Sequence, residues 1–178
     1  MPPPIWNSPT ELAGLLARIV QRIPVSGASL LHNITIDPAG VLYVSDMFTG
    51  KVHRIEGQQV TTYVENPRSP SGLAIAGKDL YVFTGEGLLR IDPAKNTTVI
   101  SKGMDGRANG LQMVNDREFL LTSWGGFVYY VNADGSNQLL LDTRAKGIPG
   151  GINLCEPKSR TMYMTTDQRN TVIAFRVK

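Results

Sequence analysis

The stretch that decides the fold is residues 32–46, HNITIDPAGVLYVSD. It holds an apolar segment, a turn and a second apolar segment, and the same arrangement returns three times, at residues 71–84, 109–122 and 150–165. Asn33, Gly72, Gly110 and Gly151 occupy equivalent places, so the repeats are 39, 38 and 41 residues long. Short strands in a repeat of about 40 residues are typical of the blades of a β-propeller.

Each repeat divides into short strands separated by turn residues. In the first repeat the expected strands cover about residues 34–36, 42–45, 52–55 and 60–64, with a turn at residues 37–40, DPAG, between the first two. Proline presets φ for such a turn and glycine accepts the positive φ that closes it. The pattern predicts an all-β propeller with four four-stranded blades, near residues 31–66, 67–103, 104–144 and 145–178.

The apolar alternation also predicts where each strand packs. We expect eight aliphatic side chains on the innermost strands: Ile34, Ile36, Leu73, Ile75, Leu111, Met113, Ile152 and Leu154. Four more should lie in the layers between blades: Val44, Val82, Leu121 and Met164.

The fourth repeat reaches only its third strand, at residues 171–177. Residues 20–25 precede the first innermost strand and are predicted to close the ring as the outer strand of that blade, where Pro24 is tolerated because an outer edge is unpaired. Residues 1–30 would then form a unit of their own, with a short helix that Ser8 caps. That helix either covers an end of the propeller or docks a partner.

Composition limits the function classes. The chain has 178 residues, of which 42% are hydrophobic and 19% charged, as expected of one soluble domain with a buried core. The net charge of +3 is spread thinly, which argues against a nucleic-acid partner. The sequence predicts neither a membrane span nor a signal peptide, and so favours a cytoplasmic protein. The single Cys155, within an apolar strand, is expected to be a buried inert thiol.

Several blade motifs resemble those of the senescence-marker-protein/gluconolactonase/luciferin-regenerating-enzyme superfamily and of the neighbouring NHL-like propellers. They are ANGL at residues 108–111, LYVSD at 42–46 followed by GKVHRI at 50–55, and SWGG at 123–126 followed by VYYV at 128–131. The resemblance covers about residues 31–178. Members usually have six blades, so the chain is either a compact four-bladed variant or the C-terminal four blades of a larger ring. An incomplete ring would favour oligomers.

The resemblance implies a chemistry to look for. Family hydrolases hold a divalent cation, often Ca²⁺, which polarises a lactone or ester carbonyl. Asn109, followed by Gly-Leu, resembles the family's ligand asparagine, and Asp46 is the carboxylate that we expect to join it in a metal site. The equivalent strand starts carry Asn33, Ser71 and Gly150 in place of the expected acidic residues.

Loops from every blade should meet at one rim, where we place the candidate ligand residues: His32, Asn33, Glu86, Arg107, Trp124 and Asp167. Trp124 is expected to hold the place in its blade that Asp46 and Glu86 hold in theirs. Several roles stay open at this point. Asp46 and Asp167 suit turn acceptors as well as ligands, His32 suits a structural hydrogen bond as well as a general base, and Trp124 suits inter-blade packing as well as a binding wall.

Two functions follow. The first is a non-catalytic propeller that binds a small molecule or a protein at its rim, which the missing acidic residues favour. The alternative is a calcium-dependent lactonase or ester hydrolase.

Overall fold

The structure of the chain is a computed structural model that describes residues 21–144, 152–156, 159, 161–165 and 171–176. These residues form fifteen β-strands and no α-helix. The strands are β1 (Leu31–Ile36), β2 (Leu42–Asp46), β3 (Lys51–Glu56), β4 (Gln59–Glu65), β5 (Leu73–Ala76), β6 (Asp79–Thr84), β7 (Gly87–Ile91), β8 (Thr97–Ser101), β9 (Ala108–Met113), β10 (Phe119–Ser123), β11 (Phe127–Val131), β12 (Asn137–Asp142), β13 (Ile152–Glu156), β14 (Thr161–Thr165) and β15 (Val172–Arg176).

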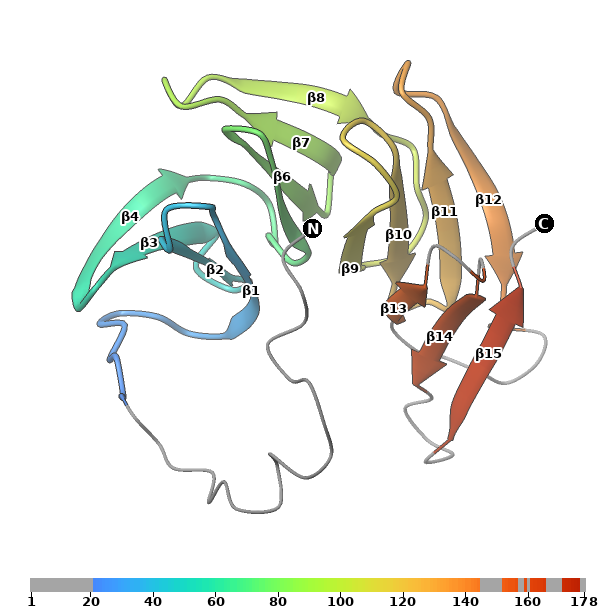
Figure 1. Cartoon of the computed structure of the whole chain (residues 1–178), viewed down its shortest axis with the longest axis horizontal. Helices are drawn as coiled ribbons and strands as arrows, with labels where there is room; N and C mark the ends of the chain where they lie inside the picture. The colour runs from blue at the N-terminus through green and yellow to red at the C-terminus, as the bar shows by residue number, and fades with distance from the viewer. Residues whose placement is uncertain (1–20, 145–151, 157–158, 160, 166–170, 177–178) are drawn as a thin grey trace.

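Consecutive strands pair antiparallel into four sheets, with the orders β1-β2-β3-β4, β5-β6-β7-β8, β9-β10-β11-β12 and β13-β14-β15. Figure 1 shows the sheets following one another around an arc, with the first strand of each on the inner side. Contacts join β1 to β5, β5 to β9 and β9 to β13. The all-β propeller architecture with four blades is therefore confirmed.

Turn chemistry explains why the strands end where they do. Between β1 and β2 the amide of Gly40 donates to the carbonyl of Asp37 at 3.0 Å, and Gly40 has φ of 86°. Side chains with a β-carbon rarely adopt that conformation. The Asp37 carboxylate also accepts from the amides of Ala39 and Val41, both at 2.9 Å. The predicted DPAG turn is thus formed.

The core lies between neighbouring sheets. One apolar layer joins the first two sheets through Tyr43, Val52, Leu80 and Val82, among others. The remaining two layers join the second sheet to the third, around Tyr81, Phe119 and Leu121, and the third to the fourth, around Leu120, Val128, Met162 and Met164. The predicted layer residues Val82, Leu121 and Met164 lie in these layers. Val44 is also buried, but it pairs with Ile34 and belongs to none of the three layers.

The first sheet is less covered than expected. Ile34 and Ile36 lie on the innermost strand as predicted, but they are 59% and 58% exposed. Thr35 pairs with Tyr43, which packs toward the second sheet, so alternation turns both isoleucines to the opposite face.

The predicted closing strand is not found among residues 21–25, the described part of that segment. Pro24 instead lines one pocket together with Val60 and Thr61 of β4 in the first sheet. The chain that follows is held there because the Asp46 carboxylate accepts hydrogen bonds from the amides of Ser29 and Leu30. The described part of the fourth sheet accordingly has three strands. The predicted N-terminal helix falls outside the described residues.

Candidate functional site

The starts of three innermost strands meet through one buried hydroxyl, that of Ser71. Its Oγ lies 3.0 Å from Nδ1 of His32 in the first blade and donates to the backbone carbonyl of Asn109 in the third blade at 2.8 Å. Ser71 itself precedes β5 and has no exposed surface. In the sequence, Ser71 is notable only as a strand start without a carboxylate, whereas in the fold its hydroxyl links three blades.

The hydrogen-bond network assigns the proton on His32. A serine hydroxyl has a single hydrogen, and that of Ser71 is used by the carbonyl of Asn109. Nδ1 of His32 must therefore be the donor to Ser71 Oγ. In the neutral ring this leaves Nε2 as an acceptor, and none of the described residues hydrogen-bonds it.

Burial of the His32 imidazole lowers its pKa below the usual value of 6.5. Desolvation disfavours the charged form, so the ring is neutral at physiological pH. Nε2 can accept a hydrogen bond or a proton from a bound molecule. Ser71, in contrast, does not suit a nucleophile, because its hydroxyl is fully buried and its proton is engaged.

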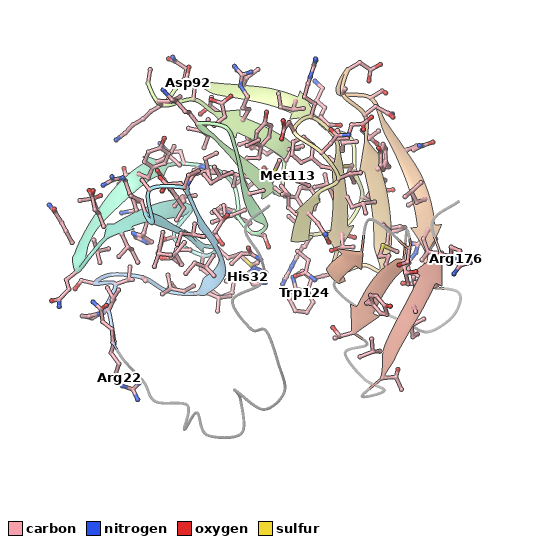
Figure 2. The ribbon with its side chains drawn as sticks, in the orientation of Figure 1. Arg22, His32, Asp92, Met113, Trp124 and Arg176 are labelled. Atoms are coloured by element: carbon pink, nitrogen blue, oxygen red, sulfur yellow. The ribbon has the colours of Figure 1, made fainter. Side chains whose placement is uncertain are left out.

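Trp124 follows β10 and forms the apolar part of this site. Its side chain is 40% exposed, and its ring centroid lies 6.3 Å from that of His32, with the planes tilted by 59°. Figure 2 shows the two side chains facing one another on the inner side of the arc. A large, partly exposed ring beside an acceptor nitrogen suits a planar organic ligand.

Three equivalent backbone hydrogen bonds correct the predicted match of Trp124 with Asp46 and Glu86. The amides of Met47, Gly85 and Trp124 donate to the carbonyls of Leu30, Arg68 and Arg107, at 2.9, 2.7 and 2.9 Å respectively. Trp124 therefore corresponds to Met47 and Gly85, one position away from the predicted match with Asp46 and Glu86. The pairings of β1 with β2 and of β9 with β10 each contain a register shift, whereas the pairing of β5 with β6 is regular. Gly85 therefore lies one residue nearer to Gly72 than Met47 and Trp124 lie to Asn33 and Gly110.

Asp46 is completely buried at the end of β2, and its oxygens are already engaged. They accept from the amides of Ser29 and Leu30, at 3.1 and 2.8 Å, and from the hydroxyl of Thr49 at 2.5 Å. Burial acts to raise the pKa of Asp46, but the hydrogen bonds from Thr49, Leu30 and Ser29 outweigh it and bring the pKa to about 2. This carboxylate holds the chain that enters the first blade.

The other candidates are dispersed. The amide of Asn33 donates to Ser45 Oγ at 3.0 Å, and the amide of Glu86 donates to Thr84 Oγ1 at 3.1 Å. The side chains of Glu86 and Arg107 are exposed. Asp167 lies outside the described residues, as does Gly150. Within the described part of the chain, no three His, Cys, Asp or Glu side chains come close enough together to hold a metal ion.

Close approach of the strands depends on one glycine. A β-carbon on Gly72, next to Ser71, would lie 2.6 Å from both the amide nitrogen and the Cβ of Leu111. No real β-carbon is accommodated at that distance without movement of β9. Gly72 therefore lets the Ser71 hydroxyl reach the carbonyl of Asn109.

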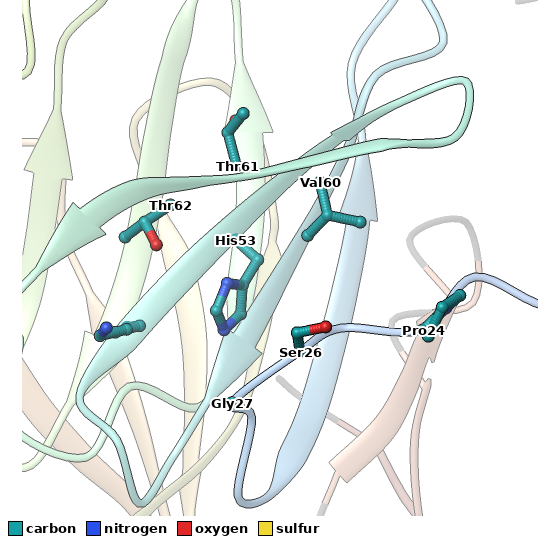
Figure 3. Close-up of a pocket in the computed structure, with 8 residues that line it drawn as sticks. Pro24, Ser26, Gly27, His53, Val60, Thr61 and Thr62 are labelled. Atoms are coloured by element: carbon teal, nitrogen blue, oxygen red, sulfur yellow. The ribbon is translucent and has the colours of Figure 1, made fainter.

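A separate pocket of about 220 Å³ lies on the first blade, away from this rim. Figure 3 shows His53 of β3 between Thr62 of β4 and the segment that carries Ser26 and Gly27. Nε2 of His53 lies 3.6 Å from Oδ2 of Asp46, an ion-pair distance, and has no hydrogen-bond partner among the described residues.

Comparison with known proteins shows which solved structures share this fold. No protein-family model matches the sequence, and neither does any curated protein. Solved structures do match. A calcium-binding regucalcin from Agrobacterium tumefaciens has a TM-score of 0.68 at 20% identity, over 85% of this chain and 55% of its own. A gluconolactonase from Xanthomonas campestris has a TM-score of 0.61 at 18% identity, over 83% and 58% of the two chains.

Virginiamycin B lyase from Staphylococcus aureus also matches, with a TM-score of 0.60 at 15% identity, over 87% of this chain and 58% of its own. The chain has the fold of these propellers. It spans a little over half the length of each of the three. Among the described residues, no helical segment has the length and apolar character needed to cross a membrane.

Proposed function

We propose that the chain is a ligand-binding propeller module whose site is the rim formed by His32, Asn109 and Trp124. The observation that carries this proposal is the hydrogen-bonded chain from His32 Nδ1 through Ser71 Oγ to the carbonyl of Asn109. It fixes the ring orientation and leaves Nε2 as an acceptor beside the exposed ring of Trp124. The ligand class that this pair recognises is a small planar molecule with an O–H or N–H donor.

Two fragments test the recognition directly. Phenol carries both a ring and a donor, whereas anisole has the same ring with its hydroxyl methylated. We would use the Trp6→Phe variant, because the chain has two tryptophans and this change leaves Trp124 as the only indole. The Trp124 indole N–H signal in a ¹⁵N correlation spectrum should move with phenol along a saturating isotherm, and anisole should bind several-fold more weakly.

The His32→Ala variant supplies the control. It keeps the Trp124 ring, so both fragments should still contact the rim, but the preference for phenol over anisole should disappear. The proposal fails if phenol leaves the Trp124 signal in place, or if the preference for phenol survives in His32→Ala.

The second candidate is a calcium-dependent lactonase or ester hydrolase. The likeness to a gluconolactonase and the place of Asn109 at an innermost strand start favour it. The donor set fits a hard cation poorly, because the oxygens of Asp46 accept three other hydrogen bonds and the described residues gather no cluster of acidic or histidine ligands. A calcium-induced rise in melting temperature that Asn109→Ala abolishes, together with hydrolysis of an aryl ester, would favour this candidate.

A further inference from the structure

The pocket on the first blade is lined by a polar pair that the other blades do not have. In each of the first three sheets the outermost pairing has one irregularity, and this aligns the three blades. The residues directly after it are His53, Leu89 and Tyr129, which pair with Thr62, Val99 and Leu139 respectively. The first three of these six are buried. A histidine facing a hydroxyl is therefore not needed to build a blade, because the second blade has two aliphatic side chains at the same place.

His53 presents an acceptor nitrogen to this pocket. Its Nε2 is buried, has no hydrogen-bond partner among the described residues and lies 3.6 Å from Oδ2 of Asp46. A carboxylate can only accept a hydrogen bond, so in the neutral ring the proton is favoured on Nε2 and Nδ1 is the acceptor. Because His53 lines the pocket and Nε2 faces Asp46, Nδ1 is the nitrogen that a bound molecule can reach (Figure 3).

Lys51 gives the same pocket a cationic donor. It lies two residues from His53 on one face of β3, about 7 Å along the strand, and also lines the pocket. Its Nζ lies 3.3 Å from Oε1 of Glu65, an ion pair that uses one of the three N–H groups of the ammonium. The lining is therefore dipolar. Lys51 attracts negative charge, whereas the acceptor of His53, with the Asp46 carboxylate behind it, attracts a positively charged donor.

We propose that this pocket binds an α-amino acid with an aliphatic side chain. The ammonium group of the ligand donates to Nδ1 of His53, and its carboxylate faces the ammonium of Lys51. Each basic side chain of the pocket already lies beside a carboxylate, Asp46 or Glu65, so the site has no surplus charge with which to hold a simple anion. A zwitterion matches both ends of the lining and adds no net charge.

The rest of the lining suits the remaining parts of such a ligand. Pro24 and Val60 form an apolar wall for its side chain, and the hydroxyls of Ser26 and Thr62 can each donate to its carboxylate or accept from its ammonium. The volume of about 220 Å³ is the room of about seven water molecules at about 30 Å³ each, below the range of about 300 Å³ and more for drug-sized ligands. Valine is of suitable size.

Three probes with one carbon skeleton test the two charged contacts. They are L-valine, isovalerate, which lacks only the amino group, and isobutylamine, which lacks only the carboxylate. The amide signal of Gly27, a lining residue, should move with L-valine along a saturating isotherm in a ¹⁵N correlation spectrum. Each of the other two probes should bind at least about tenfold more weakly, because one charged hydrogen bond is lost. The indole signal of Trp124 should stay in place, which separates this pocket from the rim.

Two variants test the residues of the pocket. The double variant His53→Leu/Thr62→Val copies the second blade, so it should keep the circular dichroism spectrum and lose valine binding. Lys51→Gln, at a half-buried position, should weaken valine about fivefold, and it tests the site even where the double variant does not fold. Lys78→Gln, in an exposed turn, is the control and should bind valine as the unchanged chain does.

Three results would overturn the proposal. The first is a Gly27 signal that stays in place at high millimolar valine. The second is isovalerate or isobutylamine binding as tightly as valine, since the pocket would then recognise a single charge. The third is a folded double variant that still binds valine.

Discussion

The carboxylate of Asp46 lies 3.6 Å from Nε2 of His53, and both side chains are buried beneath the segment that enters the first blade. The same carboxylate accepts hydrogen bonds from the amides of Ser29 and Leu30 and the hydroxyl of Thr49. One side chain therefore fastens the entering chain, the β2–β3 turn and β3 together. Its loss should affect stability far more than its size suggests.

Asp46→Asn should lower the free energy of unfolding by about 2–3 kcal/mol, because the amide group turns a donor toward groups that need an acceptor. Urea denaturation followed by circular dichroism measures this change. Asp116→Asn, in the exposed turn before β10, is the control and should change stability by less than about 0.5 kcal/mol. Equal stability of the two variants would show that Asp46 does not fasten this segment.

Acid should destabilise the protein in the range where Asp46 titrates. The pKa of Asp46 is lowered from 3.8 to about 2, so its contribution to stability is present above pH 4 and is lost as the pH falls from there toward 2. The shift corresponds to about 2 kcal/mol. Urea denaturation at pH 5, 4 and 3 should show a decline that is smaller in Asp46→Asn than in the unchanged chain.

Ser71→Ala should remove the hydrogen bonds that link the first three blades at the rim. Nδ1 of His32 loses its acceptor and the carbonyl of Asn109 loses its donor, at a cost of about 1–3 kcal/mol in the free energy of unfolding. The ¹⁵N chemical shifts of His32 should also move, because nothing then holds the proton on Nδ1. Ser26→Ala, at an exposed serine, should leave both measurements unchanged.

Gly72→Ala should destabilise the protein by about 1–3 kcal/mol, because its new β-carbon would lie 2.6 Å from atoms of Leu111. Gly85→Ala is the matched control. Its nearest neighbour, the carbonyl oxygen of Arg68, lies at 3.4 Å, and Gly85 does not have a positive φ. Thermal melting should separate the two variants clearly, and similar melting temperatures would contradict a tight approach of the second and third blades.

Mild acid should lower the stability of the protein through His32. Its pKa is lowered by burial, so the unfolded chain binds more protons than the folded one between the folded pKa and 6.5. Stability should therefore fall as the pH drops below 6.5 and level off below the folded pKa. His32→Gln should flatten this part of the pH profile in thermal melts at pH 7.5, 6.5 and 5.5. A slope that persists in this variant would assign the effect to another group.

The repeats made the blades predictable because each strand carries its own pattern. Leu120 and Leu121, for example, follow from apolar residues between turn signals, and both are buried in β10. The site was less accessible to sequence reasoning. The Ser71 link joins residues from three repeats, and the match of Trp124 with Met47 and Gly85 depends on register shifts in the first and third blades. Neither feature is local in the sequence.

The predicted closing strand was also wrong because of contacts that are not local in the sequence. Residues 20–25 have the length and composition of an edge strand, but the acceptors of Asp46 hold the adjacent chain at the first blade. Whether Asp46 binds turn amides or a cation also depends on what surrounds it, since both roles require the same carboxylate.

The chain of contacts from β1 to β5, β9 and β13 has a consequence for cooperativity. Each sheet is a meander of consecutive strands, and it buries its apolar side chains against the blades beside it. The second and third blades have described neighbours on both sides, whereas the first and fourth have one each. Asn109 therefore lies on a blade that described neighbours support on both sides, and we expect its amide to exchange with solvent more slowly than that of His32 in the first blade.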